Sequence, residues 1–224
     1  MLKLYKLQKG FDKRRPVLRE VTLSLEAGAA ICIAGRNATG KTTLLRLACG
    51  LIFPDCGTVS CSGSIAFVPQ EPALLPELTV LDNLKLWYSA QGLDGPSFVE
   101  ESFETQFGLL PFRKKRAGAL SGGMKKRLSI VTALVGSPDF LLLDEPFAAL
   151  DAPGCRELCL LLRNLKSKGI GILFTSHEPQ LIAALADQVF LLEDGKLSKE
   201  LTLCNIPEEQ RESNVLSLLF TNAL

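Results

Sequence analysis

The sequence contains no long hydrophobic run, which argues against a helix that spans a lipid bilayer. The apolar runs are short, such as FLLL at 140–143 and VFLL at 189–192, whereas a spanning helix needs about 20 apolar residues. The first residues, MLKLYKLQKG, alternate apolar and polar side chains and hold no apolar signal region. We therefore expect a cytoplasmic protein that meets a membrane only through a partner or a surface patch.

The sequence also has little net charge and no cysteine pattern typical of metal sites or disulfides. It carries 25 Lys and Arg against 24 Asp and Glu, so no strong overall field attracts nucleic acid or acidic lipid. Its 7 cysteines form no C-x-x-C pair, and we interpret them as small buried residues in a reducing compartment. The basic runs RKKR at 113–116 and KKR at 125–127 are typical of solvated faces. No nucleic-acid partner is expected.

Short apolar runs alternate with helical patterns along most of the chain. Residues 2–7 and 21–25 alternate like edge strands of a half-buried sheet, and AAICIAG at 29–35 is a nearly continuous apolar run, typical of a buried parallel strand. Later strands are predicted at FLLLDEP, GILFTS and QVFLLEDGKL, with helices such as CRELCLLLRNLKSKG between them. This order predicts an α/β fold with a mostly parallel sheet covered by helices.

One segment of the chain, about 79–135, is predicted to be helical. It contains LTVLDNLKLWYSAQG, then PSFVEESFETQFGLL, then the helix that follows LSGG. We interpret it as a helical subdomain inserted into a single domain that covers residues 1–224, a length that suits one domain with an insert. The tail at about 203–224 has a weak helical pattern and no recognisable motif.

GRNATGKTT at 35–43 lies between a predicted strand and a predicted helix, and it matches the P-loop pattern G-x-x-x-x-G-K-[ST]. Its glycines let the backbone curl so that N–H groups point toward a phosphate. Lys41 is expected to reach the β- and γ-phosphates of a nucleotide, and the Thr42 hydroxyl to bind Mg²⁺. A kinase, a helicase or a transporter ATPase can use such a loop. A GTPase is disfavoured because the sequence has no Asn-Lys-x-Asp motif.

A second glycine-rich turn, LSGGM at 120–124, opens another predicted helix. Backbone N–H groups and the dipole at a helix N-terminus favour an anion there. The simpler interpretation is an N-cap in which Ser121 accepts a hydrogen bond from Met124. The two interpretations are compatible, so the residues alone leave open why one chain carries two phosphate-binding turns.

Two adjacent carboxylates and the only histidine stand at the ends of predicted strands. Asp144 and Glu145 follow the strand of FLLLDEP, and His177 closes the strand of GILFTS. Open α/β sheets bind their ligands at this carboxyl edge. Asp144 is expected to hold Mg²⁺, Glu145 to polarise the attacking water, and His177 to hydrogen-bond the γ-phosphate. Solvated acids at a strand end and a structural histidine are the alternatives.

With Gln70 after IAFVP, the chain resembles the nucleotide-binding subunits of ATP-binding cassette (ABC) transporters over about residues 1–200. GRNATGKTT resembles the Walker A motif, LSGGM the signature, FLLLDEP the Walker B motif with its catalytic glutamate, and ALD at 149–151 the D-loop. Gln70 resembles the Q-loop glutamine, a ligand of Mg²⁺ and water, and His177 the switch histidine. Phe11 stands at about the family's spacing for an aromatic residue that stacks on adenine, with a core role as the alternative.

The resemblance implies a P-loop NTPase core with an antiparallel β edge, and an ATPase that uses ATP and Mg²⁺. It implies catalysis by Glu145, His177 and Gln70, and metal binding by Thr42, Gln70 and Asp144. The residues that it places at the nucleotide are Phe11, Gly35, Arg36, Asn37, Ala38, Thr39, Gly40, Lys41, Thr42, Thr43, Ser121, Gly122, Gly123 and Asp151. In this family two cassettes pack head to tail, as a homodimer or a heterodimer, so the second turn would serve the partner's nucleotide.

The resemblance also implies an integral membrane permease as a separate subunit, which would hold the protein on the inner face of the cell membrane. The stretch Glu71–Leu78, with Leu74 and Leu75 as anchors, is the predicted docking surface, and a loop that packs on its own domain is the alternative. The compact chain and LSGGMKKRLSI resemble small bacterial exporters. The alternative function is a soluble ABC-family ATPase that acts on nucleic acid or ribosomes.

Three residues depart from the family's pattern. Arg36 stands where proline is common, Ala38 where glycine is common, and Met124 where the signature usually has glutamine. A methyl group at position 38 is tolerable only if φ is negative, so a negative φ is expected there. None of the three removes a group that touches phosphate in this scheme, and activity is expected to survive.

Overall fold

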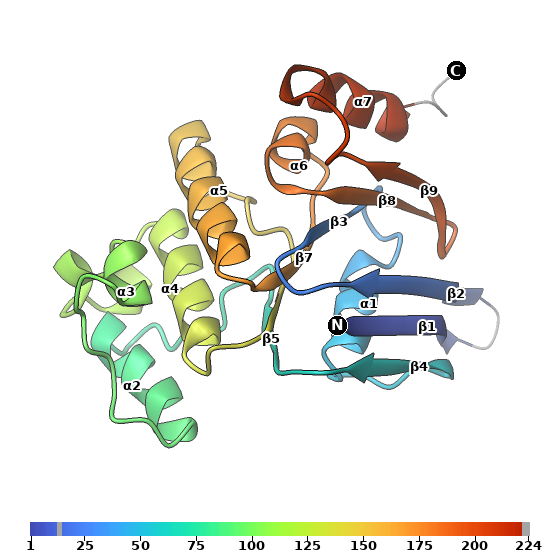
Figure 1. Cartoon of the computed structure of the whole chain (residues 1–224). Coiled ribbons are helices and arrows are strands. Elements are labelled where there is room, and N and C mark those ends of the chain that lie inside the picture. Colours follow the sequence, from blue (N-terminus) through green and yellow to red (C-terminus); the bar gives the residue numbers. More distant parts are fainter. Residues whose placement is uncertain (13–14, 221–224) are drawn as a thin grey trace.

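A six-stranded sheet forms the centre of the fold (Figure 1). The computed structural model describes residues 1–12 and 15–220, and the strand order of this sheet is β5-β6-β7-β3-β8-β9. The first five strands in this order are parallel, and β9 pairs antiparallel with β8 at the edge. The strands are Ile65–Val68 (β5), Phe140–Leu143 (β6), Gly171–Thr175 (β7), Ala30–Ala34 (β3), Gln188–Glu193 (β8) and Lys196–Thr202 (β9). The predicted α/β fold with a mostly parallel sheet is confirmed.

The central strand β3 is covered on both faces. Ala30, Cys32 and Ala34 pack into one core, whereas Ile31 and Ile33 point to the other face of the sheet and pack into a second core. All five side chains are at most 1% exposed. A strand with two buried faces has no polar side, which explains the continuous apolar run in this part of the sequence.

A separate three-stranded antiparallel sheet and the helix α1 (Lys41–Ala48) share one core with the central sheet. The order of this small sheet is β2-β1-β4, with the bounds Leu2–Asp12 (β1), Arg15–Leu25 (β2) and Cys56–Cys61 (β4). The interpretation of residues 2–7 as an edge strand is wrong, because β1 pairs with strands on both of its sides. Periodicity reports which face of a strand is buried and not which strands lie beside it.

The other face of the central sheet is covered by helices. They include α4 (Gly122–Leu134), α5 (Ala152–Ser167) and α6 (Pro179–Leu185), whose apolar side chains join the larger core. The weak pattern of the tail corresponds to a helix, α7 (Glu208–Phe220), which packs against α6 and buries Val215. Residues 221–224 of the predicted tail lie outside the described residues. No helix in the described part of the chain is long and apolar enough to cross a membrane.

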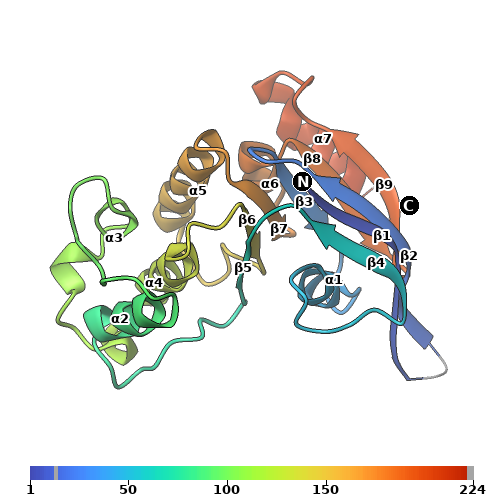
Figure 2. The same cartoon turned by 60° about the horizontal axis from the view of Figure 1, so that its bottom comes forward.

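Between β5 and β6 the regular elements are helices only. They are α2 (Val80–Ala90), α3 (Phe103–Gln106), two short 3-10 turns and α4, and Figures 1 and 2 show α2 and α3 on the side of the molecule away from the small sheet. The prediction of a helix over PSFVEESFETQFGLL is mostly wrong. Only four of its residues are α-helical, because Phe98 adopts a φ of 51° and the helix begins after Ser102, which caps it. That 79–135 is a separate subdomain stays a prediction.

The cysteines follow the expected pattern only in part. Cys32, Cys155 and Cys159 are buried, and burial raises the pKa of each thiol. Cys56 and Cys204 are exposed, so the interpretation of the cysteines as buried residues is wrong for these two. Both lie on the outside of the molecule at or beyond the end of a strand, where burial is not required.

Candidate functional site

Four neighbouring parallel strands end at one edge of the central sheet, and the predicted catalytic residues follow them there. Gln70 comes after β5, Asp144 and Glu145 after β6, and His177 after β7, while β3 leads into the P-loop. Their side chains line one cavity of about 540 Å³. The lining residues are Val17, Asn37, Ala38, Gly40, Lys41, Thr42, Thr43, Gln70, Asp144, Glu145, Ala148 and His177. The carboxyl edge is where open α/β sheets bind ligands.

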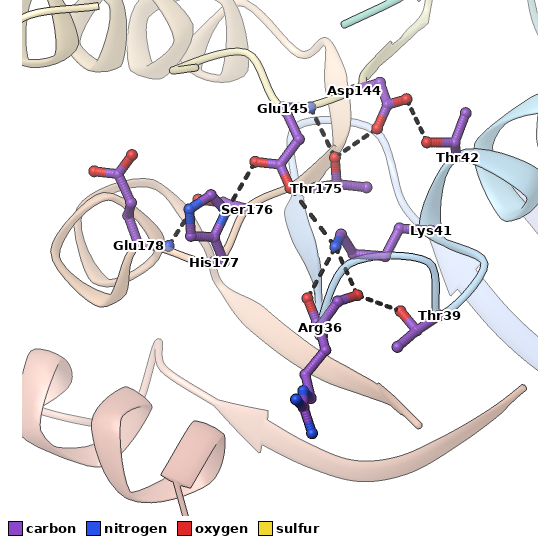
Figure 3. A network of polar contacts seen from close by, with 11 residues as sticks. Arg36, Thr39, Lys41, Thr42, Asp144, Glu145, Thr175, Ser176, His177 and Glu178 are labelled. Carbon is purple, nitrogen blue, oxygen red and sulfur yellow. Dashed lines mark hydrogen bonds and ion pairs between the residues drawn. The ribbon is translucent and has the colours of Figure 1, made fainter. Parts of the chain in front are cut away.

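Lys41, the first residue of α1, organises the P-loop. Its ammonium donates hydrogen bonds to the carbonyl oxygens of Gly35 at 2.8 Å and of Arg36 at 3.2 Å, so the loop closes around the charge (Figure 3). The same nitrogen lies 3.7 Å from a carboxylate oxygen of Glu145, and Lys41 is only 7% exposed. A buried ammonium beside loop N–H groups at a helix N-terminus is suited to bind a phosphate chain.

Two residues of the loop have positive φ. Gly40 has a φ of 106°, and a Cβ atom there would lie 2.9 Å from Val17, so only glycine fits. Ala38 has a φ of 64°, and the expectation of a negative φ is therefore wrong. The turn around Lys41 imposes this conformation, and the cost for a residue with a Cβ is on the order of 1–2 kcal/mol.

The acidic residue Asp144 lies at the centre of a hydroxyl network. Thr42 Oγ1 donates to Asp144 Oδ2 at 2.7 Å, and Thr175 Oγ1 donates to Asp144 Oδ1 at 2.8 Å (Figure 3). Asp144 is 3% exposed and has both oxygens hydrogen-bonded. A hydroxyl and a carboxylate side by side are hard oxygen ligands of the kind that Mg²⁺ prefers, so the residues present fit this ion.

Glu145 and His177 lie next to each other in the lining of the cavity. The Nδ1 atom of His177 lies 3.3 Å from a carboxylate oxygen of Glu145. The backbone of Glu145 is in the left-handed region, with a φ of 44°, and its N–H donates to Thr175 Oγ1 at 2.7 Å. The carboxylate therefore lies between the ammonium of Lys41 and the imidazole of His177, as Figure 3 shows.

The loop that carries Gln70 is held by a buried lysine of α4. The ammonium of Lys126 donates to the carbonyl oxygens of Gln70 at 2.7 Å and of Pro69 at 3.4 Å. Lys126 is 3% exposed, so the interpretation of KKR as a solvated face is wrong for this residue. Burial lowers the pKa of Lys126 to about 8, against the opposing effect of the Asp144 and Glu145 carboxylates. The run at 113–116 is exposed, as expected.

The second glycine-rich turn lines a different cavity, of about 550 Å³. Ser121, Gly122, Gly123 and Asp151 all line it, together with Met124. Ser121 caps α4 by accepting a hydrogen bond from the N–H of Met124 at 3.3 Å, which confirms the simpler of the two interpretations of this turn. Asp151 caps α5 in the same way, through the N–H of Gly154.

Some predicted site residues lie outside the two cavities. Phe11 is 69% exposed and is not among the described residues that line the first cavity, so its contact with adenine stays a prediction. Gly35, Arg36 and Thr39 shape the loop instead, through the carbonyl groups that hold Lys41 and through a hydrogen bond from Thr39 to Arg36.

Four residues at or beside the site were not predicted from the sequence: Val17, Ala148, Thr175 and Lys126. Val17 and Ala148 are small apolar residues without a motif, so no sequence signal marks them. The only signal for Thr175 is a hydroxyl at the end of an apolar run. For Lys126 it is a charge among residues that the helical period places on the buried face.

A P-loop after a parallel strand, with acidic residues at the end of another strand of the same sheet, defines the class of P-loop NTPases. A model of the ABC transporter family matches residues 18–148, which is more than half of the chain. The chain belongs to the ABC transporter family, as one of its ATP-binding cassettes that hydrolyse ATP.

Two relatives illustrate the range of similar proteins. The aliphatic sulfonates import ATP-binding protein SsuB of Corynebacterium glutamicum is 36% identical over 92% of this chain and 85% of its own length. The lipopolysaccharide export system ATP-binding protein LptB of Acidithiobacillus ferridurans is 30% identical over 83% of this chain and 83% of its own length. The relatives therefore include both an import protein and an export protein.

Solved structures show the same fold. One ATP-binding subunit of an ABC transporter superposes with a TM-score of 0.80 at 26% identity and covers 96% of this chain and 99% of its own. A dimeric cassette in a post-hydrolysis state, bound to ADP and Pi, superposes with a TM-score of 0.79 at 25% identity over 91% and 99% of the two chains.

Proposed function

We propose that this chain is one of two cassettes that pack head to tail around two ATP molecules and power a separate membrane permease. The observation that supports this proposal is that the two glycine-rich turns line different cavities of the same chain. The P-loop shares its cavity with Glu145 and His177, whereas Ser121 shares the other with Asp151. Two separate half-sites on one chain support a nucleotide site completed by a second chain.

The residues of the first cavity have complementary roles in this proposal. Lys41 and the loop N–H groups bind the phosphates, and Glu145 polarises the water that attacks the γ-phosphate. His177 lies beside Glu145 and is exposed on its other side, so it can contact both the γ-phosphate and the water. Gln70 orients the same water, and Phe11 stacks on adenine.

Thr42, Asp144 and Gln70 are the residues that would hold Mg²⁺. A Mg²⁺ ion held there would supply positive charge that offsets the negative charge of the phosphates. Thr175 and Thr42 keep the Asp144 carboxylate in one orientation through a hydrogen bond to each oxygen. The carboxylate is therefore positioned before the nucleotide enters, which avoids part of the ordering cost of binding.

The permease is proposed to dock beside Gln70. A groove of about 290 Å³ lies there, lined by Pro69, Ala73 and Trp87 among others. Leu75 is 53% exposed, and the buried side chain of Asn83 holds its backbone through hydrogen bonds at 2.9 and 3.0 Å. Leu74, predicted as a second anchor, packs on the core of its own chain instead. We therefore keep only Leu75 as an anchor. Docking there would keep the protein on the inner face of the membrane.

The direction of transport is proposed from the resemblance to small exporters. The similar proteins include both import and export proteins, and the cassette chemistry is the same for both. The direction is therefore expected to be set by the permease. ATP-driven uptake of substrate into inside-out vesicles that carry the complex supports an exporter, and uptake into right-side-out vesicles contradicts it.

The proposed head-to-tail dimer is tested by mixing two inactive variants. Ser121→Arg blocks the second glycine-rich turn and leaves the P-loop intact. Lys41→Ala disables the P-loop and leaves the second turn intact. Each variant alone is expected to be inactive. A one-to-one mixture is expected to regain about a quarter of the wild-type ATPase rate, because half of the dimers are mixed and each of these holds one intact site.

Two results would contradict the proposed head-to-tail dimer. One is a loss of ATP affinity in the Ser121→Arg monomer as large as in Lys41→Ala, which would mean that both turns hold the same nucleotide in one chain. The other is a mixture that forms mixed dimers, seen by cross-linking, and still shows no activity, unless both sites of a dimer must fire together.

A further inference from the structure

Glu145 has an unusual backbone conformation for a residue with a side chain. Its φ is 44°, a region that few residues other than glycine occupy. Glu145 lies two residues beyond Leu143, the last residue of β6, which is paired with Phe174 of β7. Something must hold the chain in this conformation, because an extended backbone would continue the strand and carry the carboxylate elsewhere.

Thr175 supplies that restraint from the neighbouring strand. Its hydroxyl oxygen accepts the N–H of Glu145 at 2.7 Å, in a place where a strand would offer a backbone carbonyl. Thr175 is 0% exposed, so water does not compete for this hydrogen bond. The side chain thus ends the ladder between β6 and β7 and starts the turn that carries Glu145.

Asp144 sets the direction of the same hydroxyl. The proton of Thr175 Oγ1 is donated to Asp144 Oδ1 at 2.8 Å, which leaves a lone pair for the N–H of Glu145. Only a group that is donor and acceptor at once can make both bonds, and at this position serine or threonine provides it. Figure 3 shows the hydroxyl between the two acidic residues.

We propose that Thr175 is a positioning residue for ATP hydrolysis, which holds the Glu145 carboxylate at the reacting water by fixing the Glu145 backbone. The proposal rests on the proposed role of Glu145 as the base. Thr175 is buried and is not among the described residues that line the open cavity, so it acts through its neighbours. The bond from Thr42 to Asp144 does not involve Thr175, so one of the two restraints on the Asp144 carboxylate remains, and nucleotide binding is expected to depend less on the Thr175 hydroxyl than kcat does.

The test replaces the hydroxyl while keeping the shape of the side chain. In Thr175→Val, kcat for ATP is expected to fall by about 10- to 100-fold, the effect of a misplaced catalytic group, with KM changed less than about threefold. Thr175→Ser keeps the hydroxyl and is expected to retain kcat within about threefold of wild type. An unchanged kcat in Thr175→Val, or a folded Thr175→Ser as slow as Thr175→Val, would overturn the proposal.

A second background separates this proposal from the one on which it rests. In Glu145→Gln chains, adding Thr175→Val is expected to leave the ATP-dependent dimer intact and to lower any residual hydrolysis less than about threefold, because both changes act at the same group. A folded double variant that no longer dimerises with ATP would show that Thr175 acts on nucleotide binding, against the proposal. Full activity of Glu145→Gln alone would instead remove the base assignment.

If Thr175→Val does not fold, Thr175→Cys takes its place, since a thiol forms only weak hydrogen bonds. Thermal unfolding and circular dichroism establish which variants fold. A folded Thr175→Cys with lowered kcat and little-changed KM supports the positioning role, and one with wild-type kcat overturns it.

Discussion

Ala38 places a methyl group where the loop around Lys41 requires a positive φ. The observed φ of 64° is costly for any residue with a Cβ atom. We expect Ala38→Gly to raise the free energy of unfolding by about 1 kcal/mol, because the relief of strain exceeds the added freedom of the unfolded chain. Thermal unfolding measures the change. Ser137, with a φ of 48°, lies between α4 and β6 and lines neither nucleotide cavity, and Ser137→Gly is a comparison that should stabilise similarly without changing ATP affinity. A lower melting temperature for Ala38→Gly would contradict the account.

The carboxylate of Glu145 is the chemical centre of the proposed site. Glu145→Gln keeps the shape of the side chain and removes the base, so hydrolysis is expected to fall by about 100-fold or more while ATP still binds. The ATP-bound dimer should then persist in size-exclusion chromatography. Glu178→Gln makes the same change at an exposed residue and serves as the control. Full ATPase activity in Glu145→Gln would rule out the assignment.

Local spacing explains why the main site residues can be predicted from the sequence. Gly40, Lys41 and Thr42 belong to one contiguous motif, and Asp144 ends an apolar run. Thr175 and Lys126 could not be predicted, because each binds a backbone group that only the fold brings near. The hydroxyl of Thr175 reaches an N–H 30 residues away, and the ammonium of Lys126 reaches a carbonyl 56 residues away.

At the scale of elements, α4 and the loop after β5 are joined by the buried ammonium of Lys126. Because burial lowers its pKa from 10.5 to about 8, the unfolded chain binds more protons than the folded chain between these pH values. The free energy of unfolding should therefore rise with pH across this window, by at most about 1.4 kcal/mol per pH unit, relative to a chain without the lysine.

Lys126→Met removes this dependence and is the reference for the measurement. Urea unfolding of wild type and Lys126→Met at pH 7.5 to 10 should give a stability difference that changes with pH. Lys125→Met alters the neighbouring lysine, which is only half-buried, and should follow the wild type. If the stability of wild type and of Lys126→Met changes with pH in parallel, burial does not lower the pKa of the Lys126 ammonium.

Elements differ in how well the sequence predicts them. The strands β3, β6 and β7 are continuous apolar runs with both faces covered, so they stand out from their surroundings. The segment before α3 contains enough apolar residues to suggest a helix, yet the backbone at Phe98 and the cap at Ser102 allow only one short turn. Strand neighbours, such as β4 beside β1, depend on contacts distant in sequence.

At the scale of the whole molecule, the exposed side chain of Leu75 is the anchor proposed for the permease. Leu75→Asp should leave the chain folded and able to bind ATP, because surface changes usually alter stability by no more than about 0.5 kcal/mol. It should no longer co-purify with the membrane subunit, since a charge would have to be buried in the interface. Quantitative pull-down from detergent-solubilised membranes measures the effect.

Leu160 offers a matched control for this change. It is 64% exposed on α5, away from the groove beside Gln70, and Leu160→Asp should assemble normally. A Leu75→Asp chain that also assembles normally would place the docking surface elsewhere. Wild-type chains that pull down ribosomes or DNA and no membrane protein would favour the soluble-ATPase alternative.

The short loop after β6 joins the two cavities, with Ala148 lining one and Ala149 to Asp151 lining the other. In the head-to-tail arrangement proposed above, one polypeptide therefore contributes to both nucleotide sites of a dimer. A chain with damage in both turns would disable both sites of every mixed dimer. A cell with equal amounts of intact and damaged chains would therefore keep about a quarter of its dimers fully intact. The geometry thus predicts a dominant genetic effect for such alleles.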